Sequence, residues 1–339
     1  MSEPLENSKH REALDLLIRG FQVSRMIRLV ADLGVADKIS DSGQDVHALA
    51  AACGVQGSPL LRVLRALAAF EVFQVSADGQ VRHSPRSRLL RTDTPNSMLP
   101  GARFWTGRGS WKAWGELDVA LHGGIPHETA WGIDRFQYLR EHPEEARQFD
   151  LFMANMPDNR HAALASTYDF SGVRIIADIG GGNGEALRQI LARFPTLRGL
   201  VFDRPDVVEA IPVGSRMDGR IAVEGGSFFN GVPVGADIYL LIRVLHDWSD
   251  EDCIRILQSC RAAMSTESRL LIVEQILEPD PSQGRPTGYL IDVQMMAMFG
   301  SARERTKDEF DQIFGASDLA AQRLIPTSSP VWIIEVAAI

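Results

Sequence analysis

Apolar positions in the first hundred residues recur with the spacing of helices. Between residues 12 and 33 they lie three or four positions apart, beginning with Leu14, Leu17, Ile18 and Phe21. This spacing predicts one long helix with an apolar stripe that must be buried against another surface. Two shorter helical patterns follow, in VHALAAACGV and SPLLRVLRALAAFEVFQV, and the alternation in QVRHSPRSRLL predicts a small β-wing. Residues 1–100 are therefore expected to form a winged helix-turn-helix.

The pattern changes twice further along the chain. Residues 101–165 are rich in aromatic residues and helix formers, which predicts a helical bridge. From residue 166 to residue 339, short apolar runs alternate with helical stretches: RIIADIG, LRGLVFD, ADIYLLIRVL, RLLIVE and VWIIEVA. Strands that alternate with helices indicate an α/β domain with an open parallel sheet.

Composition narrows the function classes. The chain has 339 residues, 45% of them hydrophobic and 23% charged, with a net charge of −9. Residues 1–100 carry 12 basic and 11 acidic side chains, a balance that argues against nucleic-acid binding by the winged helix. The N-terminus is acidic where a signal peptide would be basic, and no apolar run is long enough to span a membrane. Three cysteines without a C-x-x-C pair favour neither disulfides nor zinc, so we expect a cytoplasmic protein without a metal.

The segment IIADIGGGNGEALRQIL predicts a nucleotide-type cradle. A strand ends at Asp178, a turn contains Gly180, Gly182 and Gly184, and a helix follows. Glycines let the backbone approach a ligand closely, and the N–H groups of the following helix face it. The spacing is G-x-G-x-G, so the dinucleotide fingerprint G-x-G-x-x-G is absent. The next strand ends at Asp203, where α/β sheets place a carboxylate against a ribose diol, although Asp203 could instead cap the helix that follows it.

A histidine and two acids follow later strands. His246 comes directly after the apolar run IYLLIRVL, and Glu274 ends the next strand. Both should lie at the carboxyl edge of the sheet, where open α/β domains bind ligands. A lone loop histidine is also compatible with a structural role, and Ser249 with Asp252 reads as a capping box for the helix behind it.

The run LHDWSDEDC, together with RLLIVEQIL and RERTKDEF, resembles the class I S-adenosylmethionine-dependent O-methyltransferases of the caffeate, hydroxyindole and polyketide-tailoring type. The resemblance covers nearly the whole chain. It implies a Rossmann-type catalytic domain preceded by a mainly helical winged-helix dimerisation domain, with S-adenosylmethionine as cofactor and S-adenosylhomocysteine as product. It also implies a homodimer in which the helices of one subunit cover the pocket of the other.

The resemblance carries roles for individual residues. It makes His246 the general base, oriented by Glu274 and Glu304, although Thr306 and Glu309 form a capping-box signal beside Glu304. The implied cofactor-binding residues are Asp178, Gly180, Gly182, Gly184, Asp203, Ser227, Phe228 and Arg243. The implied acceptor pocket contains Met153, Asp247, Met295 and Phe299. Ser227 stands where the family usually has an aspartate beside the adenine, so recognition of that base is expected to differ.

These observations favour methylation of a hydroxyl on a small aromatic or enolic secondary metabolite. The proton of a phenol should leave as the methyl group arrives, because its pKa of ~10 lies well above that of an imidazole near ~6.5. Two alternatives stay open: a relative that binds the cofactor but performs hydroxylation, decarboxylation or ring formation, and a DNA-binding regulator that senses a metabolite. The acceptor, the position methylated, and the choice of oxygen over nitrogen or carbon lie beyond the sequence.

Overall fold

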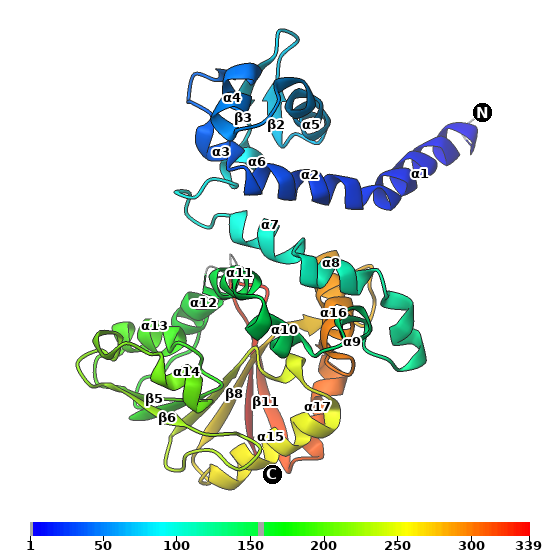
Figure 1. Cartoon of the computed structure of the whole chain (residues 1–339). Helices are drawn as coiled ribbons and strands as arrows, with labels where there is room; N and C mark the ends of the chain where they lie inside the picture. Colours follow the sequence, from blue (N-terminus) through cyan, green and yellow to red (C-terminus); the bar gives the residue numbers. More distant parts are fainter. Residues whose placement is uncertain (1–2, 155–158) are drawn as a thin grey trace. The chain divides into compact units, whose positions relative to one another are not determined.

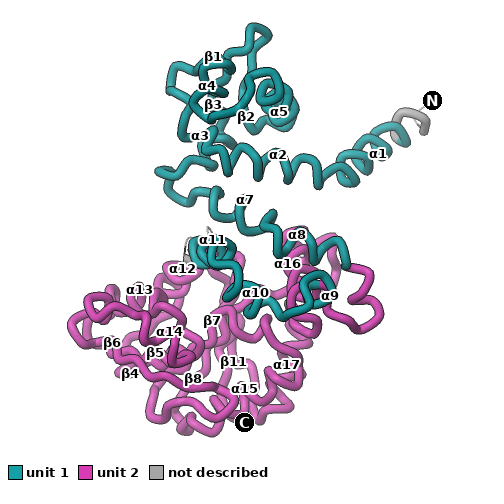
Figure 2. The backbone as a smooth tube through the Cα atoms, viewed as in Figure 1, with its two compact units in different colours: residues 1–116, 127–157 teal, residues 117–126, 158–339 magenta. Residues whose placement is uncertain are grey.

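The structure is a computed structural model that describes residues 3–154 and 159–339. The chain divides into two compact units (Figure 2). The first contains residues 1–116 and 127–157, and the second contains residues 117–126 and 158–339. The division therefore falls within residues 101–165, the segment for which the sequence predicts a helical bridge.

The first unit contains the predicted winged helix. Helices α4 (Val46–Cys53) and α5 (Gly57–Ala69) are joined by a short turn, and a three-stranded antiparallel sheet follows them in the order β1-β3-β2. The strands are β1 (Gln44–Asp45), β2 (Phe73–Val75) and β3 (Gln80–His83). Two short helices, α3 (Val35–Lys38) and α6 (Pro85–Arg88), precede and follow them in the chain. Apolar side chains from all these elements form one core, including Leu49, Leu64, Leu67, Phe73 and Val81. The alternation in QVRH thus marks a real strand, as predicted.

The long N-terminal helix is broken in two. Helix α1 (Glu3–Ile18) ends before Arg19 and α2 (Gly20–Asp32) begins after it, because Gly20 has a low preference for a helix interior. The prediction of a single helix was therefore wrong at this point. Along the stripe, Leu17 is 78% exposed and Phe21 is 57% exposed within the single chain. The first half of the stripe is thus exposed in the single chain, whereas in the second half Val30 is buried in the core of the first unit.

Short helices form the rest of the first unit: α7 (Leu99–Trp105), α8 (Arg108–Trp114), α9 (Pro126–Trp131), α10 (Arg135–Glu141) and α11 (Pro143–Ala154). Helices α7 and α11 are held together by aromatic rings. The ring of Phe104 stacks on that of Phe152 with 4.5 Å between centroids, and Trp105 meets Phe152 edge-on at 5.2 Å. Such pairs stabilise a helical contact beyond the area they bury.

The second unit contains a seven-stranded sheet with the order β11-β12-β8-β7-β4-β5-β6. Its strands are β4 (Ile175–Ile179), β5 (Arg198–Asp203), β6 (Ile221–Gly225), β7 (Ile238–Ile242), β8 (Arg269–Glu274), β11 (Leu319–Pro326) and β12 (Trp332–Ala338). The five strands from β4 to β8 are parallel, but β12 runs antiparallel to both of its neighbours. The predicted open parallel sheet is therefore present in these five strands. The hairpin of β11 and β12 adds antiparallel pairs at one edge, because the connection between these two strands is too short for a crossover.

Helices cover both faces of this sheet (Figure 1). On one face α12 (Arg160–Thr167), α13 (Glu185–Arg193) and α14 (Pro205–Glu209) pack, and on the other lie α15 (Asp250–Ala263) and α17 (Lys307–Gly315). Along β7, Ile238 and Leu240 face the first layer while Tyr239 and Leu241 face the second. This burial on both sides explains why the strands read as continuous apolar runs. The unit also contains three 3-10 turns: η1 (Leu117–His122), η2 (Val213–Ser215) and η3 (Leu245–Asp247). Two short strands, β9 (Ile276–Leu277) and β10 (Arg305–Thr306), pair in parallel, and helix α16 (Pro286–Phe299) lies between them in the chain.

Candidate active site

The glycine-rich turn after β4 forms the cradle that the sequence predicts. Gly180, Gly182 and Gly184 all have positive φ angles, of 72°, 55° and 78°. Residues other than glycine rarely adopt this backbone region. Helix α13 begins directly after Gly184. A Cβ atom on Gly182 would meet no other atom within 4 Å. The backbone at Gly182 therefore faces open space that a ligand can approach.

Asp178 lies beneath this turn as an unpaired carboxylate. The side chain is 1% exposed, and its Oδ2 atom has no hydrogen-bond partner among the described residues. A Cβ atom on Gly181 would lie 2.7 Å from that oxygen, so only glycine fits there. Burial, with a smaller contribution from nearby Asp203, raises the pKa of Asp178 to about 7. A cationic group beside the turn would relieve this cost, and the ammonium of an amino-acid ligand has that chemistry.

Asp203 stands at the end of β5 and joins the same turn. Its carboxylate accepts hydrogen bonds from the backbone N–H of Gly182, at 2.9 Å, and of Arg204, at 2.7 Å. The N-cap of α14 is Arg204, so Asp203 does not occupy the capping position. The N–H of Gly226 donates to the Asp203 carbonyl, which brings the segment with Ser227 to the same edge. Ser227 is exposed there, and Phe228 packs edge-on against Trp248.

His246 lies in the η3 turn that follows β7, between two carboxylates. Its Nδ1 atom is 3.4 Å from Oε2 of Glu274, which ends β8, and its Nε2 atom is 3.3 Å from Oδ1 of Asp247. Glu274 is fully buried and also accepts a hydrogen bond from the Leu245 N–H at 3.0 Å. Burial and Arg243 act to lower the pKa of His246, but Asp247 and Glu274 outweigh them, so that pKa lies above its usual value. The predicted pairing of His246 with Glu274 is thus present in the structure.

Arg243 and Glu304 form the layer behind this pair. The Arg243 guanidinium donates to Glu274 at 2.7 Å and to Glu304 at 2.9 Å. Burial alone would lower the pKa of Arg243, yet the two glutamates raise it above its ordinary value. Glu304, predicted as a direct neighbour of His246, therefore reaches it through Arg243 and Glu274. It does so even though Thr306 and Glu309 form the predicted capping box of α17 beside it.

Arg305 contacts the turn that carries His246, and sequence reasoning did not single it out. Its side chain is fully buried and donates to the carbonyl oxygens of Leu245, at 2.8 Å, and Trp248, at 2.9 Å, on either side of His246. It also pairs with Asp250. The backbone N–H of Arg303 donates to the His246 carbonyl at 3.0 Å. An arginine inside RERT gives no local signal of these contacts, which join segments 60 residues apart.

The glycine turn and the histidine turn lie side by side. A Cβ atom on Gly180 would be 2.9 Å from Cγ2 of Val244. Helix α16 contacts η3, and Asp292 on α16 accepts a hydrogen bond from the Glu304 N–H at 2.9 Å. Met295 and Phe299 follow Asp292 by three and seven positions, so they share its helix face. Their place in an acceptor pocket stays a prediction.

Met153, the remaining predicted pocket residue, belongs to the first unit. It lies on α11 and is 45% exposed. Its role in an acceptor pocket stays a prediction.

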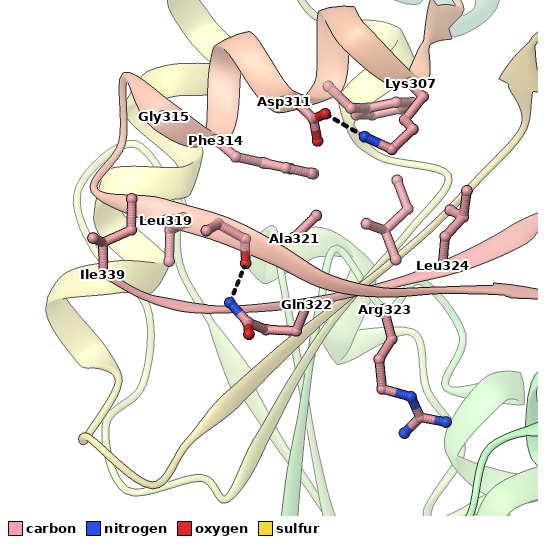
Figure 3. A pocket seen from close by; sticks show the side chains of 13 residues that line it. Lys307, Asp311, Phe314, Gly315, Leu319, Ala321, Gln322, Arg323, Leu324 and Ile339 are labelled. Carbon is pink, nitrogen blue, oxygen red and sulfur yellow. Dashed lines mark hydrogen bonds and ion pairs between the residues drawn. The ribbon is translucent and has the colours of Figure 1, made fainter.

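A second candidate binding surface in this unit lies away from the predicted site residues. A pocket of about 400 Å³ lies between α17 and β11, and the described residues that line it include none of the predicted site residues (Figure 3). An ion pair between Lys307 and Asp311 stands at this pocket. Within residues 3–154 and 159–339, no group of three or more His, Cys, Asp or Glu side chains could hold a metal ion. Over the same residues, no helix has the length and apolar character needed to cross a membrane.

Comparison with known proteins matches the chain to O-methyltransferases in both sequence and fold. The profile of an O-methyltransferase domain matches residues 114–318, and that of an O-methyltransferase dimerisation domain matches residues 16–93. The chain is 38% identical over 329 residues to a phenazine O-methyltransferase of Lysobacter antibioticus, with 94% of each chain covered. The structure is similar to that of a mitomycin 7-O-methyltransferase, with a TM-score of 0.90 and 31% identity over 99% of this chain and 100% of the other. It is also similar to the SAH-bound form of a methyltransferase of calicheamicin biosynthesis, with a TM-score of 0.85 and 30% identity over 98% of both chains.

Proposed function

Since this chain belongs to the S-adenosylmethionine-dependent O-methyltransferases that carry an N-terminal dimerisation domain, we propose that it methylates a hydroxyl of a small aromatic or enolic metabolite with His246 as the general base. The observation that carries the proposal is the pairing of His246 with the buried Glu274, beside the glycine turn. S-adenosylmethionine, when bound, supplies a methyl group that is already activated on a sulfonium. The protein therefore has to bind it, align an acceptor and remove one proton.

The residues of the glycine turn suit the cofactor. The backbone at Gly180 and Gly182 would approach its methionine end, and the unpaired carboxylate of Asp178 would balance the positive charge of that end. Asp203 would accept hydrogen bonds from the ribose hydroxyls, while Ser227 and Phe228 would border the adenine. The Arg243 side chain is already engaged with two glutamates. Its proposed contact with the cofactor therefore falls to its backbone.

His246 has the geometry to take a proton from an acceptor hydroxyl. Carboxylates face both ring nitrogens, but Glu274 on the Nδ1 side is fully buried whereas Asp247 on the Nε2 side is 39% exposed and better screened by water. Glu274 would therefore favour the tautomer with its proton on Nδ1, leave the Nε2 lone pair for the acceptor hydroxyl, and stabilise the imidazolium that forms. Complete deprotonation of a phenol of pKa ~10 by an imidazole near ~6.5 is uphill by roughly 5 kcal/mol, so proton and methyl should transfer together. Holding the reacting atoms ~3 to 3.5 Å apart contributes ~7 kcal/mol or more, so alignment outweighs base catalysis.

The acceptor would lie against the α16 face that carries Met295 and Phe299. A flat aromatic ring suits such apolar side chains, while Asp247, beside Nε2 of His246, can accept a hydrogen bond from a neighbouring hydroxyl or amine. A relative that is 38% identical is a phenazine O-methyltransferase. Hydroxyphenazines therefore head the panel of acceptors, followed by hydroxynaphthoates and hydroxyquinones.

The test is methyl transfer by the wild type and by the His246→Ala and His246→Gln variants across that panel. We expect both variants to lose at least ~10²-fold in kcat while the calorimetric affinity for S-adenosylhomocysteine stays unchanged. The wild-type kcat should rise with pH through a midpoint above 6.5, because the base must be neutral and its pKa is raised. Full turnover in His246→Ala would remove this residue from the mechanism.

We infer that the chain is a homodimer whose interface includes the apolar stripe of α1 and α2. Leu17 and Phe21 are large, apolar and exposed on adjacent turns, as expected for residues that a second subunit covers. The double variant Leu17→Asp, Phe21→Asp should elute as a monomer in light scattering coupled to size exclusion, whereas the control Leu121→Asp, at a residue that is 80% exposed, should stay dimeric. A dimeric double variant would place the interface elsewhere.

A further inference from the structure

On the premise that His246 is the base, we propose that the Arg243 side chain is a positioning residue that holds Glu274 and Glu304 together and thereby keeps Glu274 against the Nδ1 edge of His246. The proposal gives Glu304 an indirect role, through Arg243, in place of direct contact with the histidine. It concerns the resting protein, so it can be tested without turnover.

The contacts of Arg243 form a closed chain. Its Nη1 atom lies 2.7 Å from Oε2 of Glu274 and 2.9 Å from Oε2 of Glu304, and its Nη2 atom binds Oε1 of Glu304. All three side chains are at least nine-tenths buried, at 9%, 0% and 1% exposure for Arg243, Glu274 and Glu304. Two buried carboxylates repel one another unless a cation lies between them. Without the guanidinium fork, repulsion from Glu304 would move Glu274, and that movement would release His246.

The backbone of Arg243 supports a role beyond packing. Its φ angle is +54°, in the left-handed region that is unfavourable for a residue with a side chain. The backbone N–H nevertheless donates to the Val273 carbonyl at 3.0 Å, on the strand that ends at Glu274. The left-handed turn thus directs the chain from β7 into η3 and ties it to β8 at the same residue. A glycine would adopt this conformation freely, yet an arginine occupies the position, which fits a requirement for the arginine side chain.

The charges around His246 make the effect measurable. Arg243 and the two glutamates together carry one net negative charge, and Asp247 adds another beside Nε2. The other charged or titratable groups that face this cluster are Arg160 on α12, Cys253 and Asp250 on α15, Asp292 on α16, Arg305 on β10, and Arg303 just before it. Replacing Arg243 by a neutral residue raises the net negative charge near His246, whereas replacing it by lysine preserves that charge and removes only the planar fork.

The experiment is ¹⁵N NMR of the histidine rings in the protein without cofactor, with the His246 signals assigned by their loss in His246→Gln. At pH 9 we expect neutral His246 in the wild type to carry its proton on Nδ1. Arg243→Lys should give a mixture of the two tautomers, because a single ammonium cannot hold both carboxylates in place. The double variant Arg243→Met, Glu304→Gln keeps the same net charge without leaving two unpaired acids, and should show the same mixture. Arg269→Lys, at the opposite end of β8, is the matched control and should resemble the wild type.

Titration of the same signals separates charge from geometry. Arg243→Met alone should move the midpoint of His246 upward by roughly one to two pH units, and the double variant should bring it back toward the wild-type value. In methyl transfer, Arg243→Lys and the double variant should lose at least ~10-fold in kcat with an unchanged KM for S-adenosylmethionine.

Three results would overturn the proposal: an unchanged tautomer in both Arg243→Lys and the double variant, an unmoved midpoint in a folded Arg243→Met variant, or full kcat in the double variant. Failure of the proposed function would look different. In that case His246→Gln would retain its rate, while the tautomer and the midpoint would still depend on Arg243.

Discussion

Under the proposed function, the buried carboxylate of Asp178 couples the stability of the protein to cofactor binding. The perturbation is Asp178→Asn, which keeps the shape of the side chain and removes its charge. In the wild type, the pKa of Asp178 is raised from 3.8 to about 7, with burial as the first cause. A group whose pKa is raised on folding contributes stability that is fully present below the pKa of the unfolded chain and is lost as the pH rises through the pKa of the folded chain.

The magnitude follows from that difference. A gap of about 3 pH units corresponds to about 4 kcal/mol of folding free energy. The wild type should therefore lose up to about 4 kcal/mol through this one group between pH 4 and pH 8, while Asp178→Asn loses none of it. At pH 4 the two proteins should differ little through this group, and at pH 8 the variant without ligand should be the more stable one.

The assay is urea unfolding of both proteins without ligand at pH 4, 6 and 8, together with titration of S-adenosylhomocysteine at pH 8. The variant should bind that ligand at least ~10-fold more weakly, because a charge-assisted hydrogen bond contributes ~1.5 to 3 kcal/mol. Saturating ligand should then stabilise the wild type more than the variant.

Asp237→Asn is the control with the opposite sign. Asp237 accepts hydrogen bonds from the Arg174 side chain and from the N–H groups of Arg174 and Ile175, and these contacts lower its pKa. Its stabilisation is present above the pKa of the unfolded chain and is lost as the pH falls, so the Asp237→Asn variant should be the less stable protein at pH 8. Equal stability of the wild type and Asp178→Asn at pH 8, with unchanged ligand affinity, would refute the assignment of Asp178 as an unpaired carboxylate at the cofactor site.

Three further outcomes follow from the same geometry. Gly182→Ala and Gly219→Ala both place a methyl group at a positive φ with open space around it. Calorimetric melting should therefore show a similar loss of ~1 kcal/mol of stability for each variant. Only Gly182→Ala should weaken cofactor binding in a calorimetric titration. Arg305→Lys should lower kcat at least ~10-fold with little change in cofactor affinity, since one ammonium cannot bind both carbonyls that flank His246; full activity would show that these contacts do not place the base. Phe314→Ala empties a fully buried position on α17, and urea unfolding should report a loss of about 3 to 5 kcal/mol with kcat unchanged in the folded protein.

Local patterns predicted the central strands of the sheet and the candidate residues at its carboxyl edge. The continuous apolar runs of β4, β5, β7 and β8 predicted strands buried on both faces, and the glycines after β4 predicted a close-approach turn that their φ angles confirm. Positions at strand ends brought Asp203, His246 and Glu274 to one edge, because parallel strands all end on the same side of a sheet. These inferences needed only the spacing of residues within a short segment.

Other features depend on segments that are distant in sequence. The position of β12 between β11 and β8 depends on pairing such as that of Trp332 with Glu274, which no local pattern encodes. Two sets of contacts join segments about 60 residues apart: Glu304 binds Arg243, and Arg305 binds the carbonyls of Leu245 and Trp248. The sequence by itself determined which strands end in candidate ligand-binding residues, because alternation and glycine spacing are local properties of the chain. Only the tertiary structure decided which charges become partners, because a buried ion pair depends on which side chains lose water together when the sheet and its helices close over them.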